Sequence, residues 1–254
     1  MSYIDPQAEN QNQPNQYQSE KLHTRKILLN GEIEVHGRIP QSSNVTLLVT
    51  CSLDGSELLA VYKPIKGERP LSDFHPGLYY REIAAYELSE LLGWDLVPET
   101  LERKDAPFGP GSVQRYVPED GISHYFSLRE DLKWREILKK ICTFDVIANN
   151  SDRKSGHVLL AQDRIWAIDN GLCFHQDDKL RTVIWDFGGE IIEENLVNDL
   201  KRVLTHDIHS VLGMFIDVYE EDALIRRVKT LLEIGHLPIL RQDRQWPPYP
   251  WPLV

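Results

Sequence analysis

The sequence predicts an α+β protein whose first half is rich in strands and whose second half is mainly helical. In the first half, the apolar runs VTLLVT (45–50) and ELLAVY (57–62) flank CSLDGS, and an Asp-Gly pair between two such runs favours a hairpin turn. In the second half, apolar residues recur at helical spacing from Trp134 to Ala148, and the pattern after residue 190 is mostly helical.

Length and composition fit one large domain or two small lobes that share a cleft, because the chain has 254 residues and 41% of them are hydrophobic. The net charge of −11 opposes broad binding to nucleic acid or anionic membrane, since both attract basic faces. No apolar run approaches 18 residues and the N-terminus has no apolar signal, so we expect neither a membrane span nor export. The cysteines Cys51, Cys142 and Cys173 show no disulfide or zinc spacing, which favours a reducing cytoplasm.

The chain is expected to begin with a disordered tail over residues 1–24. QAENQNQPNQYQSEK is polar, rich in Asn and Gln, and buries too little apolar surface to order itself. We expect a first lobe over 25–117. It opens with a strand-like run at 33–39, and the polar loop PQSSN (40–44) then leads to the hairpin.

The next segments complete the expected first lobe and open a second lobe over 118–254. LYYREIAAYELSELLG predicts a helix that Gly93 ends, and GSVQRYVP predicts a strand. The helix that opens the second lobe carries Asp145 as the one polar member of its apolar stripe. The loop NNSDRKSG follows, and then two strands, HVLLA and IWAID, around a QDR turn. The last segment, QWPPYPWPLV, is too rich in proline for a helix, and we expect its tryptophans to dock on the body.

Two aspartates flank this second hairpin. Asp152 lies just before the outgoing strand and Asp169 ends the returning one, so hairpin geometry places both near the open end. Two carboxylates there suit a hard divalent cation with its triphosphate, and the metal would relieve their mutual repulsion. A simpler interpretation also fits, in which Asp152 caps a turn and Asp169-Asn170-Gly171 is an ordinary turn.

A lysine and a glutamate are further candidates. Leu59, Val61 and Lys63 point to one side of their strand, so an ammonium ends an apolar face. Phosphate oxygens and a carboxylate would partner a buried ammonium, whereas a lysine that extends past the strand end would need only water. Glu82, in the first turn of the expected helix, is the candidate carboxylate. It is equally a favourable acidic residue at a helix N-terminus.

The segments VYKP, REIAAYELSELLGWDLVPET, GSVQRYV, NNSDRKSGHVLL and AIDNGLCF, in this order, resemble the catalytic domain of type II phosphatidylinositol 4-kinases over about residues 30–190. They are similar more distantly to HipA-type and protein kinases, and more closely to small bacterial proteins described as phosphatidylinositol 3-/4-kinase-like. The resemblance implies a bilobal kinase-like fold with a β-rich N-lobe and a mainly helical C-lobe. It also implies an enzyme that uses ATP with Mg²⁺ or Mn²⁺ and phosphorylates a hydroxyl group of an unknown protein, small molecule or lipid.

The resemblance assigns a role to each matching position. Lys63 would hold the α- and β-phosphates and pair with Glu82. Asp152 would orient or deprotonate the attacking hydroxyl, and Asp169 would bind the metal. The hinge, whose backbone meets adenine, would consist of Gln114, Arg115, Tyr116 and Val117. The loop that covers the phosphates would hold Ser42, Ser43 and Asn44.

Three departures from the family pattern bear on activity. His157 stands five residues after Asp152, where the family usually has an asparagine as second metal ligand. Imidazole suits manganese or zinc better than magnesium, so His157 would shift the metal preference or weaken that site, unless its ring simply packs in the strand. The phosphate loop is not rich in glycine, although hydroxyls and backbone N–H groups can still cradle phosphate. The cysteine cluster that lipidates the eukaryotic lipid enzymes is missing, which removes the main sequence argument for membrane residence.

Two other functions therefore stay open beside the kinase. One is a nucleotide-binding pseudokinase that acts as a regulatory partner, which His157 and the phosphate loop favour. The other is transfer of AMP instead of phosphate, because that chemistry differs only in which phosphorus is attacked.

Overall fold

A computed structural model describes residues 7–40, 42–240 and 247–253. Within these ranges the chain forms two compact units. The first unit comprises the chain up to Gly67 together with Leu101–Tyr116, and the second comprises Glu68–Thr100 together with the chain from Val117 onward.

The boundary between the units differs from the expected lobes, 25–117 and 118–254, because residues 68–100 belong to the second unit. This segment carries the helix α2 (Leu78–Leu92), which packs against two helices from the far end of the chain, α5 and α6. Tertiary contacts of this kind link residues that are distant in sequence, so the apolar pattern of the helix alone does not predict its partner.

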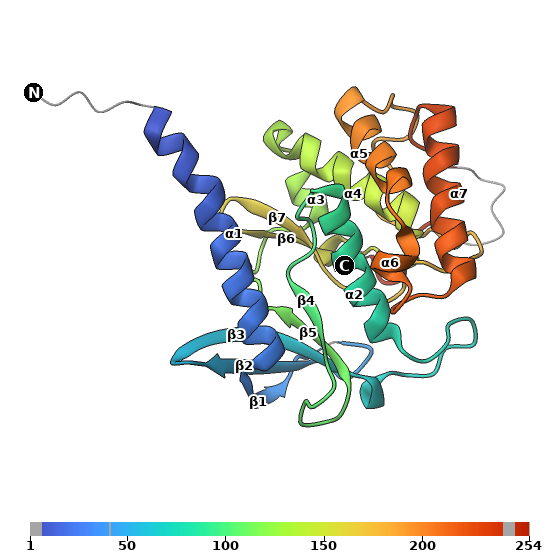
Figure 1. Ribbon diagram of the computed structural model, residues 1–254. Helices are drawn as coiled ribbons and strands as arrows, with labels where there is room; N and C mark the ends of the chain where they lie inside the picture. The colour runs from blue at the N-terminus through green and yellow to red at the C-terminus, as the bar shows by residue number, and fades with distance from the viewer. Residues whose placement is uncertain (1–6, 41, 241–246, 254) are drawn as a thin grey trace, which may run out of the picture. The chain divides into compact units, whose positions relative to one another are not determined.

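The first unit is built on a five-stranded sheet with the order β1-β2-β3-β5-β4 (Figure 1). The expected hairpin is formed by β2 and β3, which run antiparallel. Asp54 and Gly55 join them with φ values of 52° and 80°, and a type I′ turn requires positive φ at both central residues. The strands are β1 (Glu32–Arg38), β2 (Leu47–Leu53), β3 (Ser56–Pro64), β4 (Thr100–Arg103) and β5 (Gly111–Arg115).

Residues 7–24 are helical, which corrects the expectation of a disordered tail over 1–24. They belong to α1 (Gln7–Asn30), whereas residues 1–6 lie outside the described residues. Low apolar content was the basis of that expectation. Gln, Glu and Lys are nevertheless good helix formers, so a segment rich in them extends a helix that is anchored at one end.

The anchor of α1 lies in its last turns. The helix packs against β2, β3 and β5, and Ile27 and Leu28 are buried. The guanidinium of Arg103 donates to the carbonyl oxygens of Leu28 and Gly31, at 2.9 Å each. These bonds satisfy acceptors that would otherwise lack a partner at the helix end.

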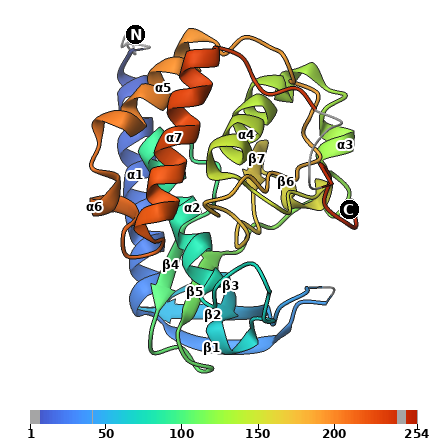
Figure 2. The same ribbon diagram turned by 90° about the vertical axis from the view of Figure 1, so that its right-hand side faces the viewer.

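The second unit is mainly helical and contains one two-stranded sheet (Figure 2). Its long helix α7 packs against α4, α5 and α6, and the strands β6 and β7 form the expected second hairpin. Among the described residues, no helix combines the length and apolar composition that crossing a membrane requires. Besides α2, the elements are α3 (Tyr125–Leu128), α4 (Arg135–Ala148), the 3-10 turn η3 (Ser155–His157), β6 (Val158–Ala161), β7 (Arg164–Ala167), α5 (Glu194–Thr205), α6 (Ile208–Leu212) and α7 (Val218–Ile234).

The proline-rich segment 247–253 docks through its backbone and not through its tryptophan. Trp251 is 87% exposed, which corrects the expectation that it packs on the body, and Trp246 lies outside the described residues. The backbone N–H of Ser155 donates to Leu253 O at 2.8 Å, and that of Thr182 donates to Pro248 O at 3.1 Å. Proline lacks an N–H but keeps its carbonyl, so such a segment can still accept hydrogen bonds from the body.

Candidate active site

The loop that carries Asp152 follows α4 directly. Asn149 ends this helix in the left-handed conformation, with φ 54°, and turns the chain into the loop. The side-chain oxygen of Asn150 then accepts the backbone N–H of Asp152 at 2.9 Å. This bond fixes the backbone at the residue from which the candidate base projects.

The carboxylate of Asp152 is partly buried and lies close to an ammonium group. Lys154 Nζ lies 3.2 Å from its Oδ2. The pKa of Asp152 is raised to about 6, chiefly by burial; Lys154 offsets part of this rise, and the charge of Asp169 adds to it. A carboxyl group with a pKa near 6 can accept a proton at neutral pH, as a general base must.

Asp169 lies at the open end of the β6–β7 hairpin, where Val158 pairs with Ala167. Its φ of 57° is left-handed, and its side chain is 48% exposed. Oδ2 lies 3.3 Å from Nε2 of His157, and Nδ1 of His157 accepts the backbone N–H of Lys154 at 3.3 Å. Because Nδ1 is an acceptor, a neutral imidazole carries its proton on Nε2 and donates it to Asp169.

Glu82 is buried in the second turn of α2, so it is not an acidic residue of the first helical turn. Its Oε2 accepts the backbone N–H of Asn170 at 2.9 Å. A Cβ atom on Gly171 would lie only 3.3 Å from Oε1, so glycine lets the backbone after Asp169 approach this carboxylate closely. Glu82 therefore binds the segment that follows Asp169, and the explanation of it as a helix N-terminal charge is wrong.

The structure thus brings four predicted residues together in the second unit: Asp152, His157, Asp169 and Glu82. Sequence patterns missed two neighbours of Asp152, namely Lys154, which pairs with it, and Arg153, whose side chain is fully buried. The signal available for Arg153 was Asp145, the one polar residue on the apolar stripe of α4. A buried carboxylate requires a partner, and Arg153 is that partner.

The remaining predicted residues lie almost entirely in the first unit. Lys63 is half-buried on β3, where it pairs in register with Ser112 of β5. In the predicted hinge, Gln114 and Arg115 belong to β5, the backbone N–H of Tyr116 donates to Leu59 O at 2.9 Å, and Val117 is the first residue of the second unit. The predicted phosphate loop, with Ser42, Ser43 and Asn44, connects β1 to β2.

A divalent metal fits the donor set of the second unit. Asp152 and Asp169 offer carboxylate oxygens, which are the ligands that Mg²⁺ and Mn²⁺ prefer. Among the described residues, no group of three or more His, Cys, Asp and Glu side chains could hold a metal alone. Two carboxylates would leave positions on a metal for triphosphate oxygens and water, which is the arrangement of phosphoryl-transfer sites.

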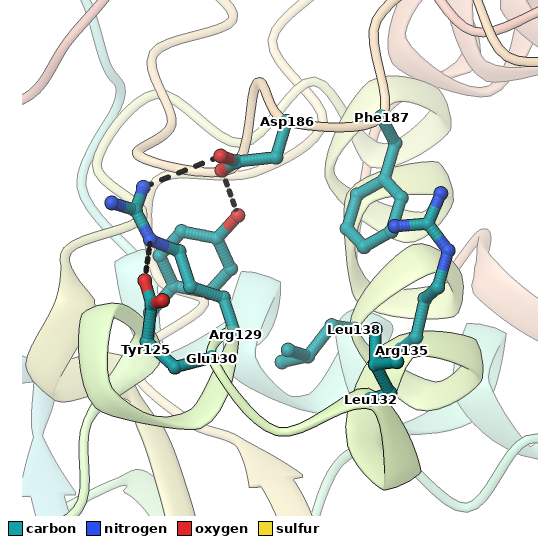
Figure 3. A pocket seen from close by; sticks show the side chains of 8 residues that line it. All are labelled: Tyr125, Arg129, Glu130, Leu132, Arg135, Leu138, Asp186 and Phe187. Carbon is teal, nitrogen blue, oxygen red and sulfur yellow. Dashed lines mark hydrogen bonds and ion pairs between the residues drawn. The ribbon is translucent and has the colours of Figure 1, made fainter.

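A separate pocket of about 250 Å³ opens between α3, the start of α4 and residues 186–187 (Figure 3). The hydroxyl of Tyr125 and the guanidinium of Arg129 both bond to Asp186 at its wall. Burial and the neighbouring carboxylate raise the pKa of Tyr125, so its hydroxyl remains a donor. α3 also packs against η3, which follows Asp152 in the chain, but neither candidate aspartate lines the pocket.

Comparison with known proteins gives one relative in sequence and several in fold. No family model matches the chain. Protein Rv2133c of Mycobacterium tuberculosis (strain ATCC 25618 / H37Rv) is 35% identical over 264 residues, which cover 89% of this chain and 94% of that protein. The crystal structure of the Golgi casein kinase with Mn/ADP bound is similar with a TM-score of 0.56 and 15% identity, over 85% of this chain and 75% of that one.

The structure of hydra Fam20 with sugar is similar with a TM-score of 0.50 and 14% identity, over 83% of this chain and 87% of that one. At such low identity these two structures establish the fold and nothing finer. The chain has a kinase-like α+β fold, as predicted.

Proposed function

This chain belongs to the family of the Mycobacterium tuberculosis protein Rv2133c, and we propose that it is an ATP-dependent phosphotransferase that acts on a hydroxyl group. One observation carries the proposal. Asp152 and Asp169 flank a single hairpin of a kinase-like fold, and Glu82 holds the backbone N–H that follows Asp169. The Golgi casein kinase, which shares the fold, binds Mn/ADP in its crystal structure, and this supports ATP with Mg²⁺ or Mn²⁺ as the ligands here.

Asp152 is assigned the role of general base toward the attacking hydroxyl of the acceptor. With a pKa of about 6, its carboxyl group is mostly ionised at pH 7 and accepts the proton of an attacking hydroxyl. The new bond joins the hydroxyl oxygen to the γ-phosphorus, and the bond from that phosphorus to the leaving ADP oxygen breaks. Lys154, 3.2 Å from Asp152, keeps the carboxylate ionised in its partly buried position.

The nucleotide-binding roles are assigned from the places of the residues in the sequence motifs. Lys63 would hold the α- and β-phosphates, and Asp169 would hold the metal. The hinge Gln114–Val117 would meet adenine through its backbone, and the loop with Ser42, Ser43 and Asn44 would cover the phosphates. A bound divalent metal would supply charge neutralisation for the triphosphate. The finer placement among phosphatidylinositol 3-/4-kinase-like proteins rests on the order of the five sequence segments.

His157 serves Asp169 better as a donor than as a second metal ligand. A metal at Nε2 would displace the proton of this nitrogen, which lies 3.3 Å from Oδ2 of Asp169. The neutral ring would then carry its proton on Nδ1 and lose the bond from Lys154 N–H. In the present arrangement, His157 therefore fixes the direction of one Asp169 oxygen.

A nucleotide-binding pseudokinase is the second candidate, and this same contact favours it. The position that usually supplies a second metal ligand holds His157, and its ring faces Asp169 as a hydrogen-bond donor. Such a protein would bind Mn·ATP without turning it over.

The deciding experiment measures transfer and binding together. The purified protein is incubated with γ-labelled ATP, Mn²⁺ or Mg²⁺, and cell extract, beside Asp169→Ala and Asp152→Asn. Label that appears with the wild type and not with either variant supports the kinase, and binding by calorimetry without label supports the pseudokinase. An acceptor that gains about 329 Da instead of about 80 Da would reveal adenylyl transfer. If the protein shows no binding and no transfer with Mn²⁺ and none with Mg²⁺, the proposal is refuted.

A further inference from the structure

Arg153, the neighbour of the proposed base, is the most completely buried charged residue of the loop. Its side chain and that of Asp145 are both 0% exposed. Arg153 Nε lies 3.0 and 3.1 Å from the two carboxylate oxygens of Asp145, and Nη2 lies 3.0 Å from Oδ1. The pair thus fastens the loop to helix α4 through a two-pronged contact, which only a guanidinium can make.

The outer edge of the same guanidinium faces the segment that contains Asp169. Nη1 donates to the carbonyl oxygen of Ile168 at 2.6 Å, and Nη2 donates to the side-chain oxygen of Asn170 at 2.7 Å. Ile168 and Asn170 are the residues immediately before and after Asp169. The planar guanidinium of Arg153, the residue after Asp152, therefore binds the chain on both sides of Asp169.

The carboxylate of Asp145 completes the connection from the other direction. Asn150 Nδ2 donates to its Oδ1 at 3.2 Å, and Asn150 Oδ1 accepts the N–H of Asp152. Thr182 donates its hydroxyl to Oδ2 at 3.1 Å. Asp145 thus bonds to Asn150 and to Arg153, which lie on either side of Asp152 in the chain.

We infer that Arg153 and Asp145 are positioning residues that set the separation and orientation of Asp152 and Asp169. This inference rests on the proposed function of the two aspartates. A buried ion pair is a poor source of stability, since apolar replacements of equal volume are often neutral or stabilising. The directed bonds to both neighbours of Asp169 give the pair a geometric role, because a metal site depends on groups that orient its ligands.

The test compares two matched substitutions of a buried arginine. Arg153→Lys keeps the charge but has one nitrogen in place of the three that make the five contacts above. The control is Arg103→Lys in the first unit, where a buried guanidinium likewise joins one carboxylate, Asp105, to two backbone carbonyls. Both variants remove a buried guanidinium that makes several hydrogen bonds, but only Arg153→Lys removes contacts to the neighbours of Asp169.

Two readouts are needed, hydrogen–deuterium exchange of the peptide 167–173 and the affinity for Mn·ATP by calorimetry. We expect Arg153→Lys to speed exchange in that peptide and to weaken Mn·ATP binding by about 10–100-fold, the usual effect of losing an orienting group. Arg103→Lys should change neither. If Arg153→Lys does not fold, Asn170→Ala removes one acceptor, leaves the ion pair intact, and should show the same two changes to a smaller degree.

The results separate this inference from the proposed function. Exchange and affinity equal to those of wild type, or exchange that rises evenly through the second unit, would overturn the positioning role. Faster exchange at 167–173 without any loss of affinity would also overturn it. A wild type that does not bind Mn·ATP would refute the proposed function, and the exchange readout alone would then decide whether Arg153 fixes the two segments.

Discussion

Removing the ammonium beside Asp152 should move the pH dependence of phosphoryl transfer. The pKa of Asp152, about 6, reflects burial first, with Lys154 opposing it from 3.2 Å. Lys154→Met keeps the length of the side chain and deletes the charge. A charge-assisted hydrogen bond contributes about 1.5–3 kcal/mol when buried and less when it is partly exposed, and 1.36 kcal/mol is one pKa unit. We therefore expect the pKa of Asp152 to rise by about one unit.

The assay is kcat/KM for labelled transfer between pH 4.5 and 8, since this parameter reports groups of the free enzyme. Below its pKa the base is protonated, so wild-type kcat/KM should fall about tenfold per pH unit below pH 6. In Lys154→Met the acidic limb should begin about one unit higher. Lys133→Met, which removes a lysine that is 58% exposed, is the control and should follow the wild type.

ATP titrates in the same way with the wild type, Lys154→Met and Lys133→Met. A shift of the acidic limb of the kcat/KM profile in Lys154→Met alone therefore identifies Asp152 as the titrating group. If the limb of Lys154→Met coincides with that of wild type, Asp152 is not the group that titrates. A wild-type profile that is flat from pH 5 to 7 would refute the reasoning as well.

Three further predictions concern stability. The pKa of Asp152 is raised from 3.8 to about 6, so between these values the folded protein retains a proton that the unfolded chain releases, and stability is lost as the pH rises through this window. Asp152→Asn removes this loss. In urea unfolding it should therefore stabilise the protein by up to about 3 kcal/mol at pH 7, but not at pH 3.5. Glu82→Ala leaves the buried N–H of Asn170 without its 2.9 Å acceptor and should cost about 1–3 kcal/mol, whereas a loss below 0.5 kcal/mol would show that this bond contributes little. Truncation after residue 246 removes the acceptors of Ser155 and Thr182 and should lower both the melting temperature and activity, while Trp251→Ala, at a side chain 87% exposed, should change neither.

Local signals predicted the hairpins and the candidate aspartates. An Asp-Gly pair specifies its own turn, because Asp54 and Gly55 must both adopt positive φ. The alternation of HVLLA and IWAID likewise places Asp152 and Asp169 at one end of a hairpin without any knowledge of the rest of the chain. These features depend on neighbours within a few residues, which the sequence shows directly.

Long-range contacts explain what the sequence did not predict. The first turns of α1 are mostly polar, and the helix is anchored at its other end, where Arg103, far along the chain, donates to the carbonyl oxygens of Leu28 and Gly31. Glu82 fits a surface helix residue until Asn170 is seen to donate to it. Arg153 is one of two cations in a polar loop, and only the fold shows that Asp145 and the neighbours of Asp169 surround it.

The proposed function is tested most directly by a crystal structure of the protein with Mn²⁺ and a non-hydrolysable ATP analogue. The anomalous signal of manganese locates the metal without reference to the rest of the map. We expect the ion on the carboxylate of Asp169, bridging to the triphosphate, with the γ-phosphate facing Asp152. A nucleotide bound elsewhere on the chain, or manganese that does not contact Asp169, would contradict the assignment of this site.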